Sequence, residues 1–235
     1  MGLADIHMHT IYSYDGTAPV KSVLQQAKRV GLDVIAITDH DEVAGALLAQ
    51  DLSYQIGIEV IPGIEITTAE GDLLALFVQK AIAPGLSLIE TLVKVGEQGG
   101  ICVAPHLMAG GLGMKSLNGF SIIKALRHAD ASRVLVGIET YNATALDRES
   151  SRYGRILAER AELAQTGSSD AHVLPAIGLG RTEFPGKTAE EFAAALYNRS
   201  TVVHKGKVWN PAMILGSWAT GYLSAVPIRM GMVVR

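Results

Sequence analysis

Two histidines near the start of the chain are the first residues that could do chemistry. His7 and His9 lie in the segment Asp5-Ile-His7-Met-His9-Thr10, and Asp15-Gly16 follows shortly after. The segment reads as a short buried strand that ends in a loop, and alternate residues of a strand point to one face. A divalent cation is the usual partner of two neighbouring buried imidazoles. A lone His-x-His pair fits one core and one exposed histidine equally well, so a metal site requires further ligands.

Further candidate ligands follow other predicted strands. Five of the seven histidines lie at such positions, whereas His128 and His204 do not. Imidazole and carboxylate without thiolate suit Mn²⁺, Zn²⁺ or Fe²⁺, and a carboxylate such as Glu65 suits a bridging position between cations. Eight N and O donors exceed the needs of one ion, so we expect two or three divalent ions. The candidates are His7, His9, Asp15, His40, Glu65, His106, Asp170 and His172.

Apolar strands that alternate with helices must position these residues. Continuous apolar runs between helices are typical of parallel strands buried on both faces, with the site at their carboxyl ends. About seven strand–helix repeats, with candidate ligands on early and late strands, favour a closed barrel of parallel strands over an open sheet. Helices are predicted over 20–30, 88–95, 122–128, 147–164 and 188–198, and strands over 33–38, 59–66, 73–78, 101–104, 134–138 and 202–203.

Composition limits the classes of protein. The chain has 235 residues, 49% hydrophobic and 18% charged, which suits one α/β domain with a sizeable core. A net charge of −3 argues against a strongly basic nucleic-acid surface. The single cysteine, Cys102, lies in an apolar run and is expected to be a buried hydrophobe. Without a secretory signal pattern at the N-terminus, we expect a cytoplasmic protein.

The C-terminal segment is unusually apolar. Residues 208–228 contain no charged side chain, and this segment is long enough to span a bilayer. However, the apolar run is interrupted by Pro211, Gly216, Gly221 and Pro227. We therefore expect a domain over 1–207 and an extension over 208–235. The extension would pack on the barrel, on a second subunit or at a membrane surface, in preference to a membrane span.

The candidate ligands lie in motifs that closely resemble the PHP (polymerase and histidinol phosphatase) family of metal-dependent phosphoesterases. The resemblance extends over about residues 3–203, with the motifs in the family's order. The motifs are Asp5-x-His7-x-His9-Thr10, Ser13-x-Asp15-Gly16, Thr38-Asp39-His40-Asp41, Gly63-Ile-Glu65, Ala104-Pro-His106 and Gly167-Ser-x-Asp170-Ala-His172.

The resemblance implies a distorted (β/α)7 barrel, similar to a TIM barrel, with a trinuclear metal site at the strand carboxyl ends. It implies all eight candidates as ligands. Two positions depart from the family pattern. Asp72 lies in a segment where several relatives carry a histidine, and Glu139 and Asn142 lie where some members place another. One metal position could therefore be weakened or differently occupied.

The implied reaction is hydrolysis of a phosphate ester by a metal-bridging hydroxide that attacks phosphorus in line. His172 or His106 is the candidate catalytic acid that protonates the leaving group, but as metal ligands they are poor proton donors, so a metal-bound water is an alternative. Asp39 would either orient the His40 imidazole or cap a turn.

Substrate contacts are expected from three further residues. Lys115 follows a glycine-rich stretch, which is either a substrate loop or a flexible surface loop. Arg181 is a second candidate for binding phosphate, and Asn142 is a third candidate substrate contact. We expect a small phosphorylated molecule or nucleotide as substrate, with phosphate or sulfate bound in the site, and favour a nucleic acid or a membrane less. The oligomeric state is left open.

Two other functions remain in competition. One is a metal-dependent amidohydrolase on a similar barrel, which usually requires a bridging lysine or an isolated general base at a strand end. The other is a non-catalytic metal-binding module with a structural or regulatory role. An intact ligand set argues against the second, because a degenerate site should have lost several ligands.

Overall fold

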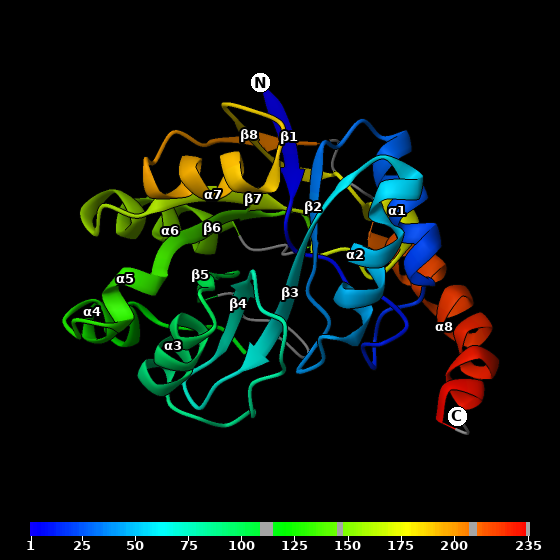
Figure 1. Cartoon of the computed structure of the whole chain (residues 1–235), viewed down its shortest axis with the longest axis horizontal. Helices are drawn as coiled ribbons and strands as arrows, with labels where there is room; N and C mark the ends of the chain where they lie inside the picture. The colour runs from blue at the N-terminus through cyan, green and yellow to red at the C-terminus, as the bar shows by residue number, and fades with distance from the viewer. Residues whose placement is uncertain (109–114, 145–147, 207–210, 234–235) are drawn as a thin grey trace.

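One strongly curved sheet organises the chain. The computed structural model describes residues 1–108, 115–144, 148–206 and 211–233. Within them, nine strands form a nearly closed barrel in the order β7-β6-β5-β4-β3-β2-β1-β8-β9 (Figure 1). The strands are β1 (Gly2–Asp5), β2 (Val34–Ile37), β3 (Glu59–Thr67), β4 (Asp72–Leu76), β5 (Ile101–Ala104), β6 (Leu135–Asn142), β7 (Ala164–Ser168), β8 (Gly180–Phe184) and β9 (Val202–Lys205). The predicted α/β barrel is confirmed.

The strands are not all parallel, so this part of the prediction was wrong. β1, β2 and β3 are parallel, as are β5, β6 and β7, but β4 is antiparallel to both of its neighbours. The four residues between β3 and β4 are too few for a parallel crossover, so the chain must turn back. β8 is antiparallel to β1 and β9, and its alternating burial differs from the continuous burial of β2.

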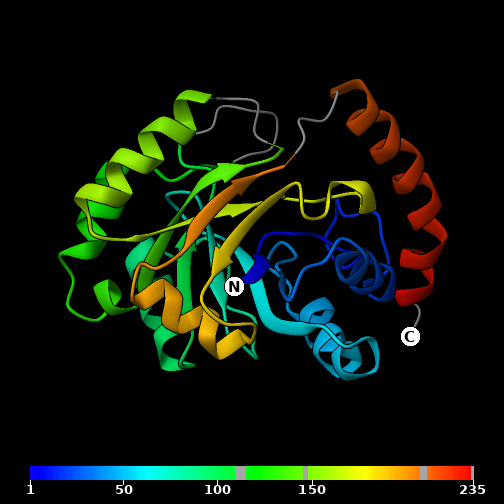
Figure 2. The ribbon, with the colours of Figure 1, turned by 90° about the horizontal axis from the view of Figure 1, so that it is seen from above.

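Helices cover the outside of the sheet and one end of the barrel (Figure 2). The helices α1 and α2 pack on the side of β1 and β2, and α3 to α6 on the side of β4 to β6. Helix α7 contacts β3, β6, β7 and β8, and so closes one end. The helices are α1 (Val20–Arg29), α2 (Ala44–Ile56), α3 (Leu88–Glu97), α4 (Gly119–Leu126), α5 (Ala131–Val134), α6 (Arg148–Arg160), α7 (Ala189–Tyr197) and α8 (Pro211–Val233), with a 3₁₀ turn at Leu174–Ala176.

Both faces of the sheet are buried in apolar clusters. On β2, Val34 and Ala36 belong to the cluster inside the barrel, whereas Ile35 and Ile37 belong to the cluster beneath α1 and α2. This alternation follows from the two-residue period of a strand. It explains why the sequence of β2 is apolar throughout, as expected for a strand between two layers.

The segments after β1 and β7 are joined by backbone and carboxylate contacts. Met8 and Ala171 form a parallel bridge, and the His9 N–H donates to the Ala171 carbonyl at 2.9 Å. The buried Asp5 carboxylate accepts from the N–H groups of Ser169 (3.0 Å) and Gly178 (2.9 Å). The chain leaving β1 is therefore fixed beside the chain leaving β7.

The C-terminal segment forms the long helix α8. Among the helices that the structure describes, none is long and apolar enough to cross a membrane. Residues 207–210 lie outside the described ranges, and the division of the chain at residue 207 stays a prediction.

The barrel interior gives a test of stability. Phe184 on β8 is fully buried and contacts the Phe192 ring edge-to-face, with centroids 5.1 Å apart. We expect Phe184→Ala to lower the free energy of unfolding by about 3–5 kcal/mol, because it leaves a cavity in the core. Phe120, which is 80% exposed, is the control, and Phe120→Ala should change the free energy of unfolding by less than about 0.5 kcal/mol. Urea denaturation of both variants measures the difference, and equal effects would contradict the packing described here.

Candidate metal centre

The eight candidate ligands converge at the carboxyl ends of the parallel strands. They come from β3 and from the segments that follow β1, β2, β5 and β7, which end at the same side of the barrel. Their donor atoms form three groups, and within each group all atoms lie within 4.8 Å of one another. The groups are His9, Asp15, His40 and His172; His7, Glu65 and His106; and His7, His9 and Asp170.

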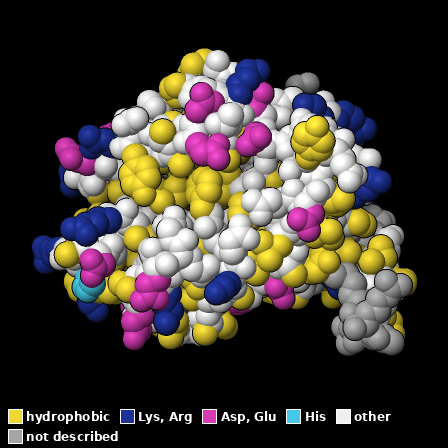
Figure 3. Space-filling model, in the orientation of Figure 1, with side chains coloured by type: hydrophobic (Ala, Val, Ile, Leu, Met, Phe, Trp, Pro, Cys, Tyr) yellow, Lys and Arg dark blue, Asp and Glu magenta, His cyan; other side chains and the backbone are white. Residues whose placement is uncertain are grey.

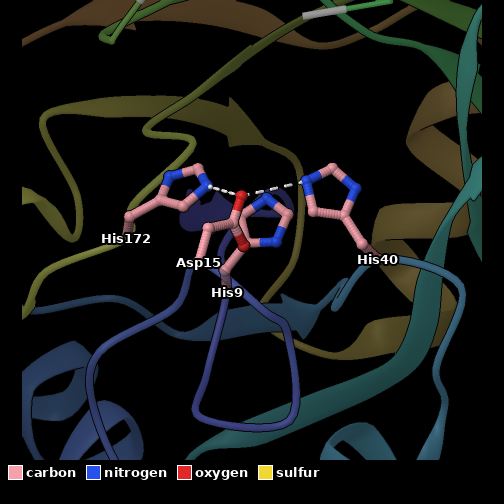
Figure 4. Close-up of side chains that lie close together, drawn as sticks. All are labelled: His9, Asp15, His40 and His172. Atoms are coloured by element: carbon pink, nitrogen blue, oxygen red, sulfur yellow. Dashed lines mark hydrogen bonds and ion pairs between the residues drawn. The ribbon is translucent and has the colours of Figure 1, made fainter. Parts of the chain in front are cut away.

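The first group surrounds the Asp15 carboxylate (Figure 4). Its Oδ2 lies 3.1 Å from Nε2 of His172 and 3.3 Å from Nε2 of His40. The ring of His9 is stacked on that of His172, with centroids 4.2 Å apart. The Ser13 hydroxyl donates to the other oxygen of Asp15 at 2.7 Å. This arrangement holds one carboxylate oxygen between two imidazoles.

Glu65 lies at the centre of the whole cluster. Its Oε2 is 3.2 Å from Nε2 of both His7 and His9 and 3.4 Å from Nδ1 of His40. Its Oε1 is 3.1 Å from Nε2 of His106. One buried carboxylate therefore faces four imidazoles, which is the placement that a bridging ligand requires.

Two of these imidazoles are oriented by their second ring nitrogen. Nδ1 of His7 lies 3.0 Å from Glu139, and Nδ1 of His106 lies 3.3 Å from the Ser116 hydroxyl. In both rings Nε2 is left facing Glu65. This is the usual pattern of metal-binding histidines, whose outer nitrogen is held by a protein acceptor.

His9 provides the clearest sign that the donor set fits cations. Its Nε2 lies 3.2 Å from Glu65 and 3.3 Å from Asp170, but the atom is buried and neither contact has hydrogen-bond geometry. A buried polar atom without a hydrogen bond is costly. A cation between this nitrogen and the two carboxylates would satisfy all three, so the residues present fit a divalent metal.

Charge interactions shift the protonation of the cluster. Burial raises the pKa of the Glu65 carboxyl, but His7 and His106 outweigh burial and hold that pKa well below its usual range. Burial lowers the pKa of His7, but Asp170 and Glu65 outweigh it and raise that pKa well above its usual value. Proton binding and metal binding therefore compete at these imidazoles, because a metal must displace any proton from the nitrogen that it binds.

The loop between His9 and Asp15 is held by a buried carboxylate. Asp39 accepts from the backbone N–H of Thr10 at 2.6 Å and from its hydroxyl at 2.7 Å. The His40 ring instead faces Asp15 and Glu65, so Asp39 acts on the loop rather than on that imidazole. Gly16 closes the loop against Thr10, where an added Cβ would lie 2.0 Å from the Thr10 carbonyl oxygen.

Two candidate ligands have a left-handed backbone. φ is +29° at His106 and +51° at Asp170, a region that residues other than glycine rarely adopt. Such backbone costs of order 1–3 kcal/mol and is typical of functional sites. At His106 the strain is offset by the backbone N–H, which donates to Glu139 at 3.1 Å.

The three predicted substrate contacts lie in different places. Asn142 is buried in β6, and its amide donates to Glu139 (2.8 Å) and Asp170 (3.1 Å). Lys115 is exposed at the edge of the site, where its N–H donates to Asp72 at 3.1 Å. Arg181 lies on β8. The glycine-rich residues 109–114 lie outside the described part of the chain, and the roles of all three side chains stay predictions.

Glu139 is a buried residue that sequence analysis did not assign to the site. One carboxylate oxygen faces the His7 ring, and the other accepts from the His106 backbone and the Asn142 amide. Its position at the end of a predicted strand was the available signal, the same one that identified His40 and His106. Glu139 therefore contacts two candidate ligands, the ring of His7 and the backbone of His106.

A cavity of about 310 Å³ opens onto the cluster. Its described lining residues include no Lys or Arg. A second cavity adjoins it, shares Tyr14, His40 and Asp72 with it, and includes Lys115 in its lining. The first cavity is lined by Tyr14, Asp15, His40, Glu65, Asp72, His106, Thr144, Asp170, His172 and Trp218.

The fold and the cluster define a barrel protein with a candidate metal centre at the strand carboxyl ends. The family model described as PHP domain matches residues 5–168, and a second model, described as PHP-associated, matches residues 150–201. The chain therefore belongs to the PHP domain family, and the resemblance in the motifs is confirmed.

Known proteins resemble the chain to different extents. An uncharacterized protein of Methanocaldococcus jannaschii is 36% identical over 150 residues, which are 60% of this chain and 81% of that protein. A two-domain protein from Bacteroides vulgatus, described as containing a predicted PHP-like metal-dependent phosphoesterase, superposes with a TM-score of 0.70 at 19% identity, over 94% of this chain and 69% of that chain. An amidohydrolase from Chromobacterium violaceum with bound sulfate superposes with a TM-score of 0.60 at 15% identity, over 86% of this chain and 97% of that chain. At such identities the two structures support the fold alone.

The raised imidazole pKa values predict a pH dependence of metal binding. Imidazolium cannot bind a cation, so each proton that His7, His9 or His106 must release weakens binding as the pH falls. We expect the affinity for Mn²⁺ to fall by about tenfold per pH unit for each proton released. Calorimetric titrations at several pH values, in two buffers of different ionisation enthalpy, measure the affinity for Mn²⁺ and the number of protons released. Binding that is independent of pH and releases no protons would contradict this competition.

The orienting role of Glu139 predicts a loss of metal affinity. Glu139→Gln replaces one acceptor oxygen by an amide, so the contact with His7 or the bonds to His106 and Asn142 must be lost. We expect affinity for Mn²⁺ to fall about 10- to 100-fold. Glu183→Gln, a partly exposed carboxylate on β8, is the control and should bind as the wild type does. Equal affinities of the two variants would show that Glu139 does not orient the ligands.

Proposed function

We propose that this protein hydrolyses a phosphate ester with the help of two or three divalent metal ions. The observation that carries the proposal is the convergence of eight residues with N and O donors, in which four imidazoles face the Glu65 carboxylate. The candidate ligands form three overlapping groups: His9, Asp15, His40 and His172; His7, Glu65 and His106; and His7, His9 and Asp170. His7 and His9 each belong to two groups, and because one imidazole nitrogen binds one ion, each would serve only one of the ions. Mn²⁺, Zn²⁺ and Fe²⁺ suit this donor set.

The charge of the cavity explains why such a reaction would depend on metal. The lining contains four carboxylates, Asp15, Glu65, Asp72 and Asp170, and no Lys or Arg among its described residues. A phosphate group would be repelled by these carboxylates unless cations were bound between them. Bound divalent ions would supply Lewis-acid chemistry, which polarises a phosphoryl oxygen and lowers the pKa of water.

The side chains themselves would mainly bind and orient. His172 contacts Asp15 through Nε2 and the Asp170 carbonyl through Nδ1, so as a ligand it is poorly placed to protonate a leaving group. Asp39 and Glu139 would keep the ligand loops and rings in place. Lys115, in the lining of the adjoining cavity, would bind a phosphate oxygen of the substrate.

The surface favours a small phosphorylated molecule over a nucleic acid. On the face seen in Figure 3, Lys and Arg side chains are scattered among Asp and Glu and form no stripe. Nucleic-acid binding depends largely on clustered positive charge. The cavity volume of about 310 Å³ lies within the range of small-molecule sites. A cytoplasmic location remains part of the proposal.

An amidohydrolase is the second candidate, because one neighbour in fold is described as such an enzyme. A lysine that bridges metals is typical of that class on similar barrels. The cavity at the centre has no lysine among its described lining residues. This difference favours the phosphoesterase.

Hydrolysis of chromogenic esters tests the proposed function. We expect Mn²⁺-loaded protein to hydrolyse p-nitrophenyl phosphate or bis(p-nitrophenyl) phosphate, and His9→Ala to lower kcat/KM by about 100-fold or more, since His9 belongs to two of the three groups. His128→Ala removes an exposed histidine that follows α4 and belongs to none of the three groups, so it should leave activity unchanged.

Other results would assign the other functions. Cleavage of p-nitroanilides without cleavage of the esters would make the protein an amidohydrolase. Metal binding without turnover of these esters or of a panel of natural phosphates would make it a non-catalytic module.

A further inference from the structure

Helix α8 lies outside both family models, which end at residues 168 and 201, yet it packs against the candidate metal centre. It runs along the side of the barrel that carries α1 and the loop before it (Figure 2). Trp218 on this helix lines the cavity at the cluster, together with Asp15, His40 and His172. The helix therefore forms part of the wall of the site.

Two side chains of α8 bind the backbone of the loop that carries Asp15. The Trp218 indole N–H donates to the carbonyl of Asp15 itself at 2.9 Å. Arg229 donates to the carbonyls of Ile11 (3.2 Å), Ser13 (2.9 Å) and Gly16. Four carbonyl groups of one short loop are thus bound by one helix more than 200 residues away in the sequence.

These two side chains are part of one continuous face of α8. The Tyr222 ring is stacked on Trp218, with centroids 5.0 Å apart, and the Arg229 guanidinium lies 5.0 Å from the Tyr222 centroid. Ala225, one turn from Tyr222, is buried. Such spacing places the residues on a single side of a helix.

The loop in turn contacts a second candidate ligand. The Thr17 backbone N–H and hydroxyl both donate to the His172 carbonyl, the hydroxyl at 2.6 Å. Gly221 of α8 approaches Thr17 so closely that an added Cβ would lie 2.9 Å from the Thr17 Cβ. The helix therefore packs against Thr17, the residue through which the Asp15 loop contacts the His172 segment.

We propose that α8 belongs to the metal centre, with Trp218 and Arg229 as positioning residues that hold Asp15 against His40 and His172. The inference rests on the proposed metal site, and it concerns only the group formed by His9, Asp15, His40 and His172. The group of His7, Glu65 and His106 is held by strands and by Glu139, so displacement of α8 should leave it intact.

A matched pair of glycine substitutions tests the proposal in the full-length protein. Gly221→Leu introduces a side chain where Thr17 leaves no room, whereas Gly216→Leu introduces the same side chain on the same helix into open space. Trp218→Phe keeps an aromatic ring but removes the donor to Asp15. Mn²⁺ binding is measured by calorimetry and by elemental analysis after dialysis, and thermal unfolding of the metal-free proteins is recorded in parallel.

We expect Gly216→Leu to bind Mn²⁺ as the wild type does. Gly221→Leu and Trp218→Phe should lower the affinity for one Mn²⁺ per chain by about tenfold or more, as expected when a ligand loses an outer contact. The affinity for the remaining ions should stay at the wild-type value. Equal weakening of all ions would indicate a general loosening of the fold and overturn the proposal. So would unchanged binding in both variants. Trp218→Phe decides if Gly221→Leu does not fold, and a wild-type protein that binds no Mn²⁺ would instead refute the metal site itself.

Discussion

The buried carboxylate of Glu65 among four imidazoles is the interaction on which the rest of the structure depends. A carboxylate buried without partners would be strongly destabilised, because no water remains to solvate its charge. Here the partners arrive from three other strands: His7 and His9 follow β1, His40 follows β2, and His106 follows β5. Only a sheet curved enough to bring these strand ends together can place them within 3.4 Å of one carboxylate. The contacts of Glu65 therefore require the curvature of the barrel.

The antiparallel strand β4 has a specific part in meeting this constraint. The first half of β3, from Glu59 to Pro62, pairs with β2, but its second half, from Gly63 to Thr67, pairs with β4. Glu65 lies in this second half, beyond the end of β2, where it is opposite Leu74. The turn back into β4 thus extends β3 into the centre of the site and holds it there. On its other edge Glu65 forms a parallel bridge with His40, in the segment that follows β2.

The sequence predicted which side chains converge better than it predicted the sheet around them. His40 and His106 were recognisable because each ends an apolar run, and that position alone implies convergence in a barrel of strands. The direction of β4 was not recognisable by the same means, since an apolar run is identical in parallel and antiparallel strands. Asp39 was placed near the site, but its partner Thr10 could not be chosen over His40 without coordinates. The contact of Trp218 with the Asp15 carbonyl depends on a fold that joins residues 203 positions apart, and no local pattern encodes it.

The donor groups differ in what holds them, and this difference has a chemical consequence. The side chains of His7, Glu65 and His106 are almost fully buried, at 3% exposure or less, and their strands fix them. The side chains of Asp15 and His172 are 19% and 22% exposed and lie on loops, where their backbone carbonyls accept hydrogen bonds from the side chains of Trp218 and Thr17. The inner group is therefore held by the sheet and shielded from water, whereas the outer group, which α8 borders, is the part of the centre that the cavity leaves partly exposed.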